Sequence, residues 1–182
     1  MTPVILSDRL RLRRWRDSDR DAFAALNADP DVARDLGGPL DRGESDAKLH
    51  RYVAAFEHDG FCRWLVEDLN EQFLGYAGVM PSRPGHPLGR HFDIGWRLVR
   101  SAWGHGYATE AAKASLRDAF ERVHLQEVLA YTSADNARSQ AVIRRLDMQR
   151  AASLDYSEPV GKGTWRGLVW IARASDRLVT QT

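Results

Sequence analysis

The stretch from Asp93 to Phe120 constrains the fold of this chain more than any other. Residues 92–99 alternate β-branched and aromatic side chains with polar or small ones, a pattern typical of a half-buried strand. From Ala108 onward, apolar residues recur at the spacing of one buried helical face. Residues 103–108 join the two segments and contain two glycines. The sequence therefore predicts a strand, a glycine loop and a helix in direct succession.

The glycine loop has the features of an anion-binding site. Gly104 and Gly106 lack a Cβ, so the backbone can take positive φ and a ligand can approach successive N–H groups. The first turn of the helix adds unpaired N–H groups and the positive end of the helix dipole. A phosphate or pyrophosphate suits such a loop, although a plain tight turn needs the same glycines. The spacing excludes a P-loop and a dinucleotide fingerprint, because His105 and Tyr107 replace the lysine and hydroxyl of the first, and Thr109 replaces the last glycine of the second.

Two segments of the chain resemble motifs of one enzyme family. Residues 103–111, WGHGYATEA, are similar to the acetyl-CoA pyrophosphate loop of the GNAT superfamily of N-acyltransferases, in the form common in the ribosomal-protein N-terminal acetyltransferase branch. Asn136-Ala137-Arg138-Ser139, followed by Val142, Leu146 and Met148, resembles the NxxSxxVxxxLGM segment of the same branch. Asp147 stands where that segment has glycine, but Asp tolerates a left-handed φ better than most residues. The likeness extends from about Arg9 to Trp170.

The resemblance implies a fold and a cofactor. The fold is one GNAT-type domain over residues 1–182, an α/β (α+β) fold whose strongly twisted mixed sheet is flanked by helices and splayed between the central strand and the next one. The co-substrate is acetyl-CoA, whose pantetheine arm would pair with the central strand, and residues 99–101 would form a bulge aimed at the acetyl carbonyl. The residues expected to bind the cofactor are Leu98, Val99, Trp103, Gly104, His105, Gly106, Tyr107, Ala108, Asn136 and Ser139. Two of them have alternative interpretations, since Asn136 is also a good helix N-cap and Ser139 could simply bond to the backbone.

The implied reaction is direct transfer of acetyl to a primary amine without an acyl-enzyme. Many family members protonate the departing thiolate with a tyrosine, but Ile143 occupies that position, and Ser139 is the expected replacement. Asp93 is the candidate general base, acting through water, with a surface carboxylate as the alternative. Deprotonating a lysine side chain at pH 7 costs about 4.6 kcal/mol, whereas deprotonating an α-amine costs about 1.4 kcal/mol. An enzyme that acts on an α-amine can therefore use a weaker general base than one that acts on lysine. The acceptor is therefore expected to be a protein N-terminus or a small amine.

Two other functions are compatible with the sequence. The missing tyrosine allows a non-catalytic acyl-CoA-binding or sensor protein. The alternating arginines of residues 9–14 could bind RNA, although such arginines on a strand are usually solvated. Nucleic acid is otherwise expected only indirectly, through a ribosomal substrate, and a homodimer is compatible with the sequence.

Composition agrees with a cytoplasmic enzyme of one domain. The 182 residues are 43% hydrophobic and 28% charged, and the net charge of +1 favours neither nucleic acid nor an anionic membrane. Cys62 is the single cysteine, which excludes an internal disulfide, and no spacing of ligands suggests a metal. No apolar run is long enough to span a membrane.

The remaining elements follow from periodicity. We expect strands at residues 9–14, 62–67, 73–80, 127–132 and 165–172, helices ending at Asn27 and covering 44–58 and 137–146, and a frayed tail at 173–182. The loops at 36–44, 81–89 and 156–164 would shape the acceptor site, whose substrate the sequence does not name.

Overall fold

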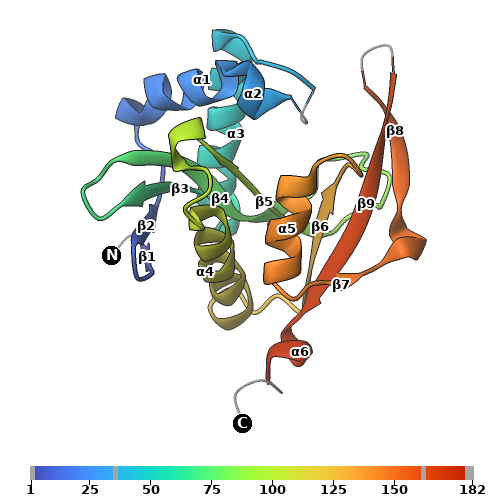
Figure 1. The fold of residues 1–182 in the computed structure, drawn as a ribbon. Coiled ribbons are helices and arrows are strands. Elements are labelled where there is room, and N and C mark those ends of the chain that lie inside the picture. Colours follow the sequence, from blue (N-terminus) through green and yellow to red (C-terminus); the bar gives the residue numbers. More distant parts are fainter. Residues whose placement is uncertain (1–2, 35–36, 161–162, 179–182) are drawn as a thin grey trace.

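The computed structural model of the chain describes residues 3–34, 37–160 and 163–178. Within these ranges nine strands form a mixed sheet in the order β1-β2-β3-β4-β5-β6-β9-β7, and β8 pairs with β9 (Figure 1). The strands are β1 (Ile5–Leu6), β2 (Leu10–Arg13), β3 (Arg63–Asp68), β4 (Phe73–Pro81), β5 (Phe92–Leu98), β6 (Glu127–Thr132), β7 (Gln149–Arg150), β8 (Tyr156–Val160) and β9 (Gly163–Arg173). The helices are α1 (Arg20–Ala28), α2 (Pro30–Ala33), α3 (Arg42–Asp59), α4 (Tyr107–Glu121), α5 (Ala137–Arg145) and α6 (Ala174–Leu178). The predicted fold, a mixed sheet flanked by helices, is confirmed.

The central strand β5 has two very different neighbours. It pairs antiparallel with β4 along its whole length, from Gly75 opposite Leu98 to Pro81 opposite Phe92. With β6 it runs parallel, and the two strands are in register at one pair, Asp93 opposite Leu129. Beyond that pair β5 and β6 diverge, so the β5 edge that faces β6 is left without a strand partner. The predicted splay between the central strand and the next one is present.

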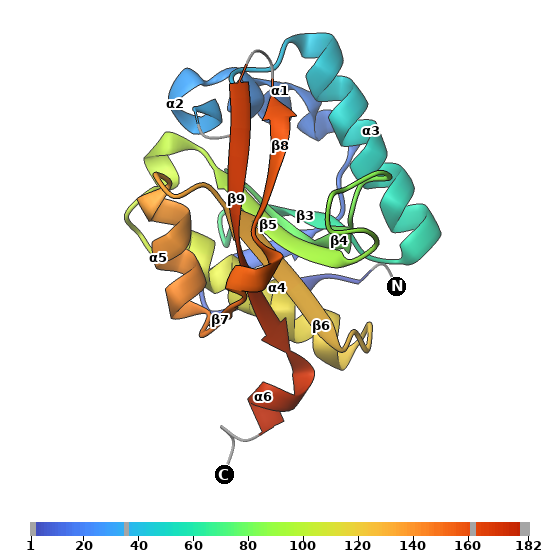
Figure 2. The ribbon, with the colours of Figure 1, turned by 90° about the vertical axis from the view of Figure 1, so that its right-hand side faces the viewer.

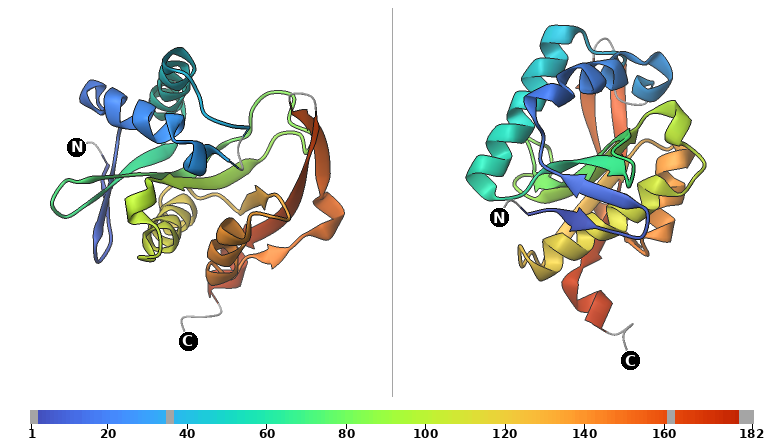
Figure 3. Two further views of the ribbon diagram at one scale, coloured as in Figure 1. Left: turned by 45° about the horizontal axis from the view of Figure 1, so that its top comes forward. Right: turned by 90° about the vertical axis from the view of Figure 1, so that its left-hand side faces the viewer.

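Helices cover the two faces of the sheet in separate groups. Helices α4 and α5 lie on one face and α1, α2 and α3 on the other (Figure 3). On the α4 face, Ile94 of β5 packs with Ala112 and Leu116 of α4. On the opposite face, Phe23 of α1 and Tyr76 of β4 belong to a second cluster. Because the inward positions of α4 are mostly alanines, this helix can lie close to the sheet beneath the splay.

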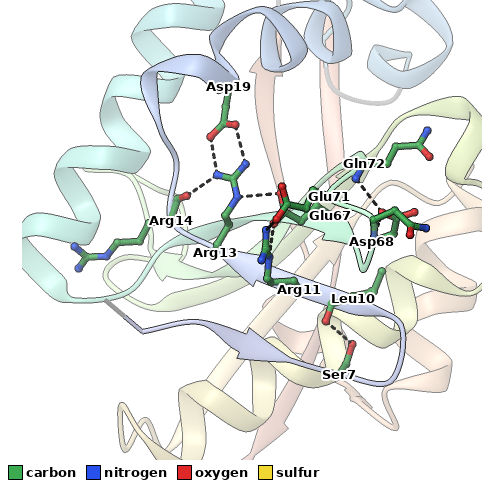
Figure 4. Close-up of polar contacts among 11 residues, drawn as sticks. Ser7, Leu10, Arg11, Arg13, Arg14, Asp19, Glu67, Asp68, Glu71 and Gln72 are labelled. Carbon is green, nitrogen blue, oxygen red and sulfur yellow. Dashed lines mark hydrogen bonds and ion pairs between the residues drawn. The ribbon is translucent and has the colours of Figure 1, made fainter. Parts of the chain in front are cut away.

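The arginines of β2 are ion-paired, which corrects the expectation that they are solvated. The register of β2 and β3 places Arg11 directly opposite Glu67. Arg11 Nε lies 2.5 Å and Arg13 Nε 2.9 Å from the two carboxylate oxygens of Glu67, and Arg13 also holds Asp19 at 2.8 Å (Figure 4). A carboxylate oxygen of Glu71 lies 2.9 Å from Nη2 of Arg11. These guanidinium groups are committed to carboxylates of the same chain, so the RNA-binding interpretation of this strand loses its basis.

The C-terminal part has more regular structure than the sequence indicated. Residues 156–160, expected to belong to a loop, form β8, which pairs antiparallel with β9. This hairpin extends toward the side of the molecule that carries α1 and α2 (Figure 2). The first residue of the expected tail, Arg173, ends β9, and the short helix α6 follows it. Residues 179–182, like residue 36 and residues 161–162 of the expected loops, lie outside the described ranges.

Candidate active site

The glycine loop adopts the backbone conformation that its sequence predicted. Gly104 has φ of +79° and Gly106 φ of +80°, and α4 begins at the next residue. The indole Nε1 of Trp103 donates to the carbonyl of Leu98 at 2.9 Å, and His105 Nδ1 lies 2.8 Å from the carbonyl of Trp103. The loop is therefore fixed against the end of β5, with the unpaired N–H groups of the first turn of α4 beside it.

A cavity of about 910 Å³ lies at this loop and brings the two sequence motifs together. Residues on its wall come from the α4–α5 face and also from the opposite face, which contributes Val32 of α2 and Arg97 of β5. The cavity is therefore lined from both faces of the sheet at the splay. Of the residues predicted to bind the cofactor, those that line it are Leu98, Trp103, Gly104, His105, Gly106, Tyr107, Ala108, Asn136 and Ser139.

The backbone of the central strand reaches the cavity at Leu98 but not at Val99. The N–H of Val99 donates to the carbonyl of Leu74 on β4 at 3.0 Å, and Val99 does not line the cavity. Neighbouring residues of a strand direct their N–H groups to opposite edges, so the N–H of Leu98 points toward the splay. Residues 99–101 form no β-bulge; a 3₁₀ turn at Arg100–Ala102 follows the strand instead. The cofactor role predicted for Val99 thus has no support from its position.

Asn136 and Ser139 stand together at the start of α5. The side-chain oxygen of Asn136 accepts the backbone N–H of Ser139 at 3.0 Å, so Asn136 is an N-cap and a cavity residue at once. Ile143, where a tyrosine was considered, is 1% exposed and packs in the core. Asp147 has φ of +54°, so it takes the left-handed conformation expected of the glycine it replaces. In this segment Ser139 is the hydroxyl group that lies at the cavity.

Asp93 lies in the protein interior and not at the cavity. Its carboxylate pairs with Nη2 of Arg63, and Nη1 of Arg63 donates to the Asp93 carbonyl at 2.7 Å. Both residues are 7% exposed. Burial lowers the pKa of Arg63, but its neighbours, Asp93 foremost, more than offset this and the pKa stands above its usual value. Asp93 is therefore not the surface carboxylate considered above, and its contacts are those of a structural ion pair.

Comparisons with known proteins agree with this geometry. The family model of the acetyltransferase (GNAT) domain matches residues 9–149. This chain belongs to the GNAT acetyltransferase family. An acetyltransferase structure from Agrobacterium tumefaciens is 26% identical, with a TM-score of 0.82 over 95% of both chains. The FsC-acetyl coenzyme A-N(2)-transacetylase of Aspergillus fumigatus is 29% identical over 78% of this chain and 63% of its own length. A ribosomal-protein-S5-alanine acetyltransferase from Vibrio fischeri shares the fold, with a TM-score of 0.76, 15% identity and coverage of 96% of this chain and 98% of its own.

Several charged residues of the GNAT cavity were not predicted to bind the cofactor. Arg9, Lys113, Arg138 and Arg145 line it with Arg97, and these cations outnumber the two lining carboxylates, Asp8 and Glu110. Arg138 lies over the ring of Trp103, 4.0 Å from its centroid. A local sequence pattern cannot show that a residue lies at this cavity. Arg9, for example, is distant from the glycine loop in the sequence and reaches it only in the folded protein. The cavity is thus suited to an anionic ligand.

Glu110 fixes the N-terminal segment to the glycine loop. Its carboxylate accepts from Ser7 Oγ at 2.8 Å and from the N–H of Arg9 at 2.9 Å, and Arg9 Nη2 lies 2.6 Å away. Arg9 Nη1 in turn donates to the carbonyl of His105 at 3.0 Å. Burial raises the pKa of Glu110, but the hydrogen bonds from Ser7 and Arg9 outweigh it and hold the pKa below its usual value.

We expect Glu110→Gln to destabilise the protein by about 1–3 kcal/mol at pH 7, since the charge-assisted bonds of a partly buried carboxylate are lost. A lowered folded-state pKa gives stability that is present above the unfolded-state value, about 4.3, and is lost as pH falls through the folded-state value. The difference between wild type and variant should therefore shrink on acidification. Urea unfolding at neutral and acidic pH measures this, with Glu71→Gln, whose carboxylate is exposed, as the control. A difference that is constant with pH would contradict the assignment.

The described residues contain neither a metal-binding group nor a membrane-spanning helix. No group of three or more His, Cys, Asp or Glu side chains in the described ranges is arranged to hold a metal ion. Among these same residues, none of the helices combines the length and the hydropathy needed to cross a bilayer.

Proposed function

We propose that this protein transfers the acetyl group of acetyl-CoA directly to a primary amine, either a protein N-terminal α-amine or a small molecule. The observation that carries the proposal is the cavity at the splay, which is walled by the glycine loop and by both faces of the sheet. A donor held at the loop on the α4 face and an acceptor arriving from the other face would meet there. The family membership supports the same reaction class.

Each group of residues on the α4 side of the cavity would bind a different part of acetyl-CoA. The N–H groups at Gly106 and the first turn of α4 would hold the pyrophosphate, helped by Arg9 and Lys113. The N–H of Leu98 would pair with the pantetheine arm, as an added strand at the free edge of β5. Asn136 would contact the same arm. Acetyl-CoA supplies the activated thioester, and the chain's own residues orient it.

The supply of nucleophiles supports direct transfer. The only cysteine, Cys62, is fully buried, and burial raises the pKa of its thiol to about 11. It does not line the cavity. The lone pair of a neutral amine would attack the thioester carbonyl, the C–S bond would break, the amine nitrogen would lose a proton to solvent water, and the CoA thiolate would gain a proton. The Ser139 hydroxyl, which lies at the cavity, is the donor we propose for that proton, and water would reprotonate it.

The test is acetyl-CoA consumption in the presence of amines. We expect release of free CoA thiol that depends on an added N-terminal peptide or small amine, with acetylated product seen by mass spectrometry. Acetyl-CoA at about 100 times its dissociation constant should stabilise the fold by roughly 2.7 kcal/mol, or about 5–11 °C in Tm for a chain of this size. ATP and NAD are the comparison ligands, and an equal shift with ATP would mean a general phosphate site.

The same experiment decides between the enzyme and the sensor. One observation favours a non-catalytic acyl-CoA-binding protein: the buried Ile143 stands where many family members have the tyrosine that protonates the thiolate. It predicts the acetyl-CoA shift without any amine-dependent release of CoA. Turnover with one amine would exclude it.

A further inference from the structure

A buried polar cluster lies between α1, α3 and the sheet, on the face opposite α4. At its centre, Asn27 is fully buried. Its Nδ2 donates to the carbonyl of Phe23 at 2.9 Å and to Ser45 Oγ at 3.1 Å, which fixes the orientation of the amide. Its Oδ1 therefore accepts from two cations, Arg97 Nη1 at 2.6 Å and Lys48 Nζ at 3.3 Å.

The positive charge of this cluster is not balanced by a carboxylate. Within the described ranges neither Lys48 nor Arg97 forms an ion pair, whereas the buried arginines Arg13 and Arg63 both do. The second partner of Lys48 Nζ is the hydroxyl of Tyr76, at 3.1 Å. Burying cations without an anion costs free energy. A negatively charged ligand bound beside Lys48 and Arg97 would therefore stabilise this part of the protein.

The ionisation of nearby groups reflects this imbalance. Burial raises the pKa of Tyr76, but the charges of Lys48 and Arg97 outweigh it and lower the pKa to about 7. Burial also lowers the pKa of Lys48. Among the described residues, the Tyr76 phenol is thus the acidic group that contacts Lys48, and no carboxylate pairs with either cation.

Arg97 connects the cluster with the cavity. It is 7% exposed and lines the cavity from the face opposite the glycine loop. Its Nε is buried and has no hydrogen-bond partner. A guanidinium with one unpartnered donor therefore lies in the cavity wall, on the face from which the acceptor is proposed to arrive.

We propose that Arg97 binds a carboxylate carried by the acceptor, so that the acceptor is a free amino acid or another small amine bearing a carboxylate. The inference rests on the proposed function, because it names the acceptor class of the same cavity. A guanidinium presents a planar pair of N–H donors that matches a carboxylate, and the added negative charge would balance the cluster. A polyamine would instead bring more positive charge to Lys48 and Arg97.

The experiment compares α-, β- and ω-amino acids with their own carboxamides, which share the amine and differ in the carboxylate. Initial rates of CoA release at saturating acetyl-CoA are compared per neutral amine. We expect kcat/KM for the acid to exceed that for the amide at least tenfold. The ratio should fall toward one in Arg97→Gln and be partly kept in Arg97→Lys. Lys48→Met, which leaves the bond from Arg97 to Asn27 in place, should lower the ratio too.

Arg14→Gln is the matched control. Arg14 also has a buried Nε without a partner, but it does not line the cavity, so its replacement should leave the ratio unchanged. Equal rates for acids and amides in the wild type, or a ratio that Arg97→Gln does not alter, would overturn the proposal and leave the cluster as a structural feature.

A binding measurement keeps the proposal separate from the activity. If acetyl-CoA binds but no amine releases CoA, the proposed function fails, and thermal unfolding with CoA plus N-acetylglycine or N-acetylglycinamide then decides on Arg97. A larger shift with the acid, lost in Arg97→Gln, supports the carboxylate site. Equal shifts, or a difference that survives in Arg97→Gln, overturn it.

Discussion

Replacing Asp93 by Ala is expected to destabilise the protein by about 3–5 kcal/mol, because it leaves the Arg63 guanidinium buried without its partner. The pocket around Arg63 is close-fitting. A Cβ added at Gly95 would lie 3.0 Å from Nη2 of Arg63, and Nη1 is already bonded to backbone carbonyls of β4 and β5. The guanidinium is therefore held between β4 and β5, so we expect it to stay buried in the variant.

Urea unfolding of Asp93→Ala, Arg63→Met and the double variant measures the pair. We expect the double variant to be more stable than Asp93→Ala, since removing both charges leaves neither unpaired. Asp21→Ala is the control, because that carboxylate pairs with Arg42 at the surface and its side chain is 88% exposed. A stable Asp93→Ala protein with lowered kcat would instead restore Asp93 as a base.

Gly106→Val is expected to weaken acetyl-CoA binding at least tenfold, or by about 1.4 kcal/mol. Gly106 has φ of +80°, a conformation that costs a β-branched residue on the order of 1–3 kcal/mol. The nearest atom to an added Cβ is Arg9 Nη2 at 3.5 Å, so the expected cause is the backbone conformation and not a clash. A loop driven to negative φ would turn its N–H groups away from the pyrophosphate.

Gly85→Val provides a matched comparison. Gly85 has φ of +73°, an added Cβ there meets nothing within 4 Å, and the residue does not line the cavity. Both variants should lose similar stability, but calorimetric titration should show weaker acetyl-CoA binding for Gly106→Val alone. Unchanged affinity in Gly106→Val would mean that the loop is a turn and not the pyrophosphate site.

Local sequence patterns predicted most of the secondary structure. Apolar alternation located β3, β4, β5 and β6 to within two residues, and helical spacing did the same for α4 and α5. Short elements were missed, such as β1, β7 and α2, because two to four residues carry no readable period. Residues 156–160 were expected to be a loop because a proline and polar residues are not typical of a strand. They form β8 only because they pair with β9.

The candidate site was predictable where one local conformation fixes the function. The positive φ of Gly104 and Gly106, the cap at Asn136 and the left-handed Asp147 all follow from residue type and neighbours. The functions of charged residues were not predictable in this way. Arg11 was expected in water and Asp93 at the surface or as a base, yet each is held by a charge that another strand supplies.

The sequence alone determined the periodicities, the glycine positions and the two motifs that mark the chain as a GNAT acetyltransferase, because each depends on residues within a few turns or one strand. Tertiary structure decided which charges meet. Arg9 reaches Glu110 across 101 positions, and Arg97 reaches Asn27 across 70. Such pairs exist only once strand order and register are set. For that reason the loop could be predicted from its own residues, while the cluster proposed to choose the acceptor emerged only from the fold.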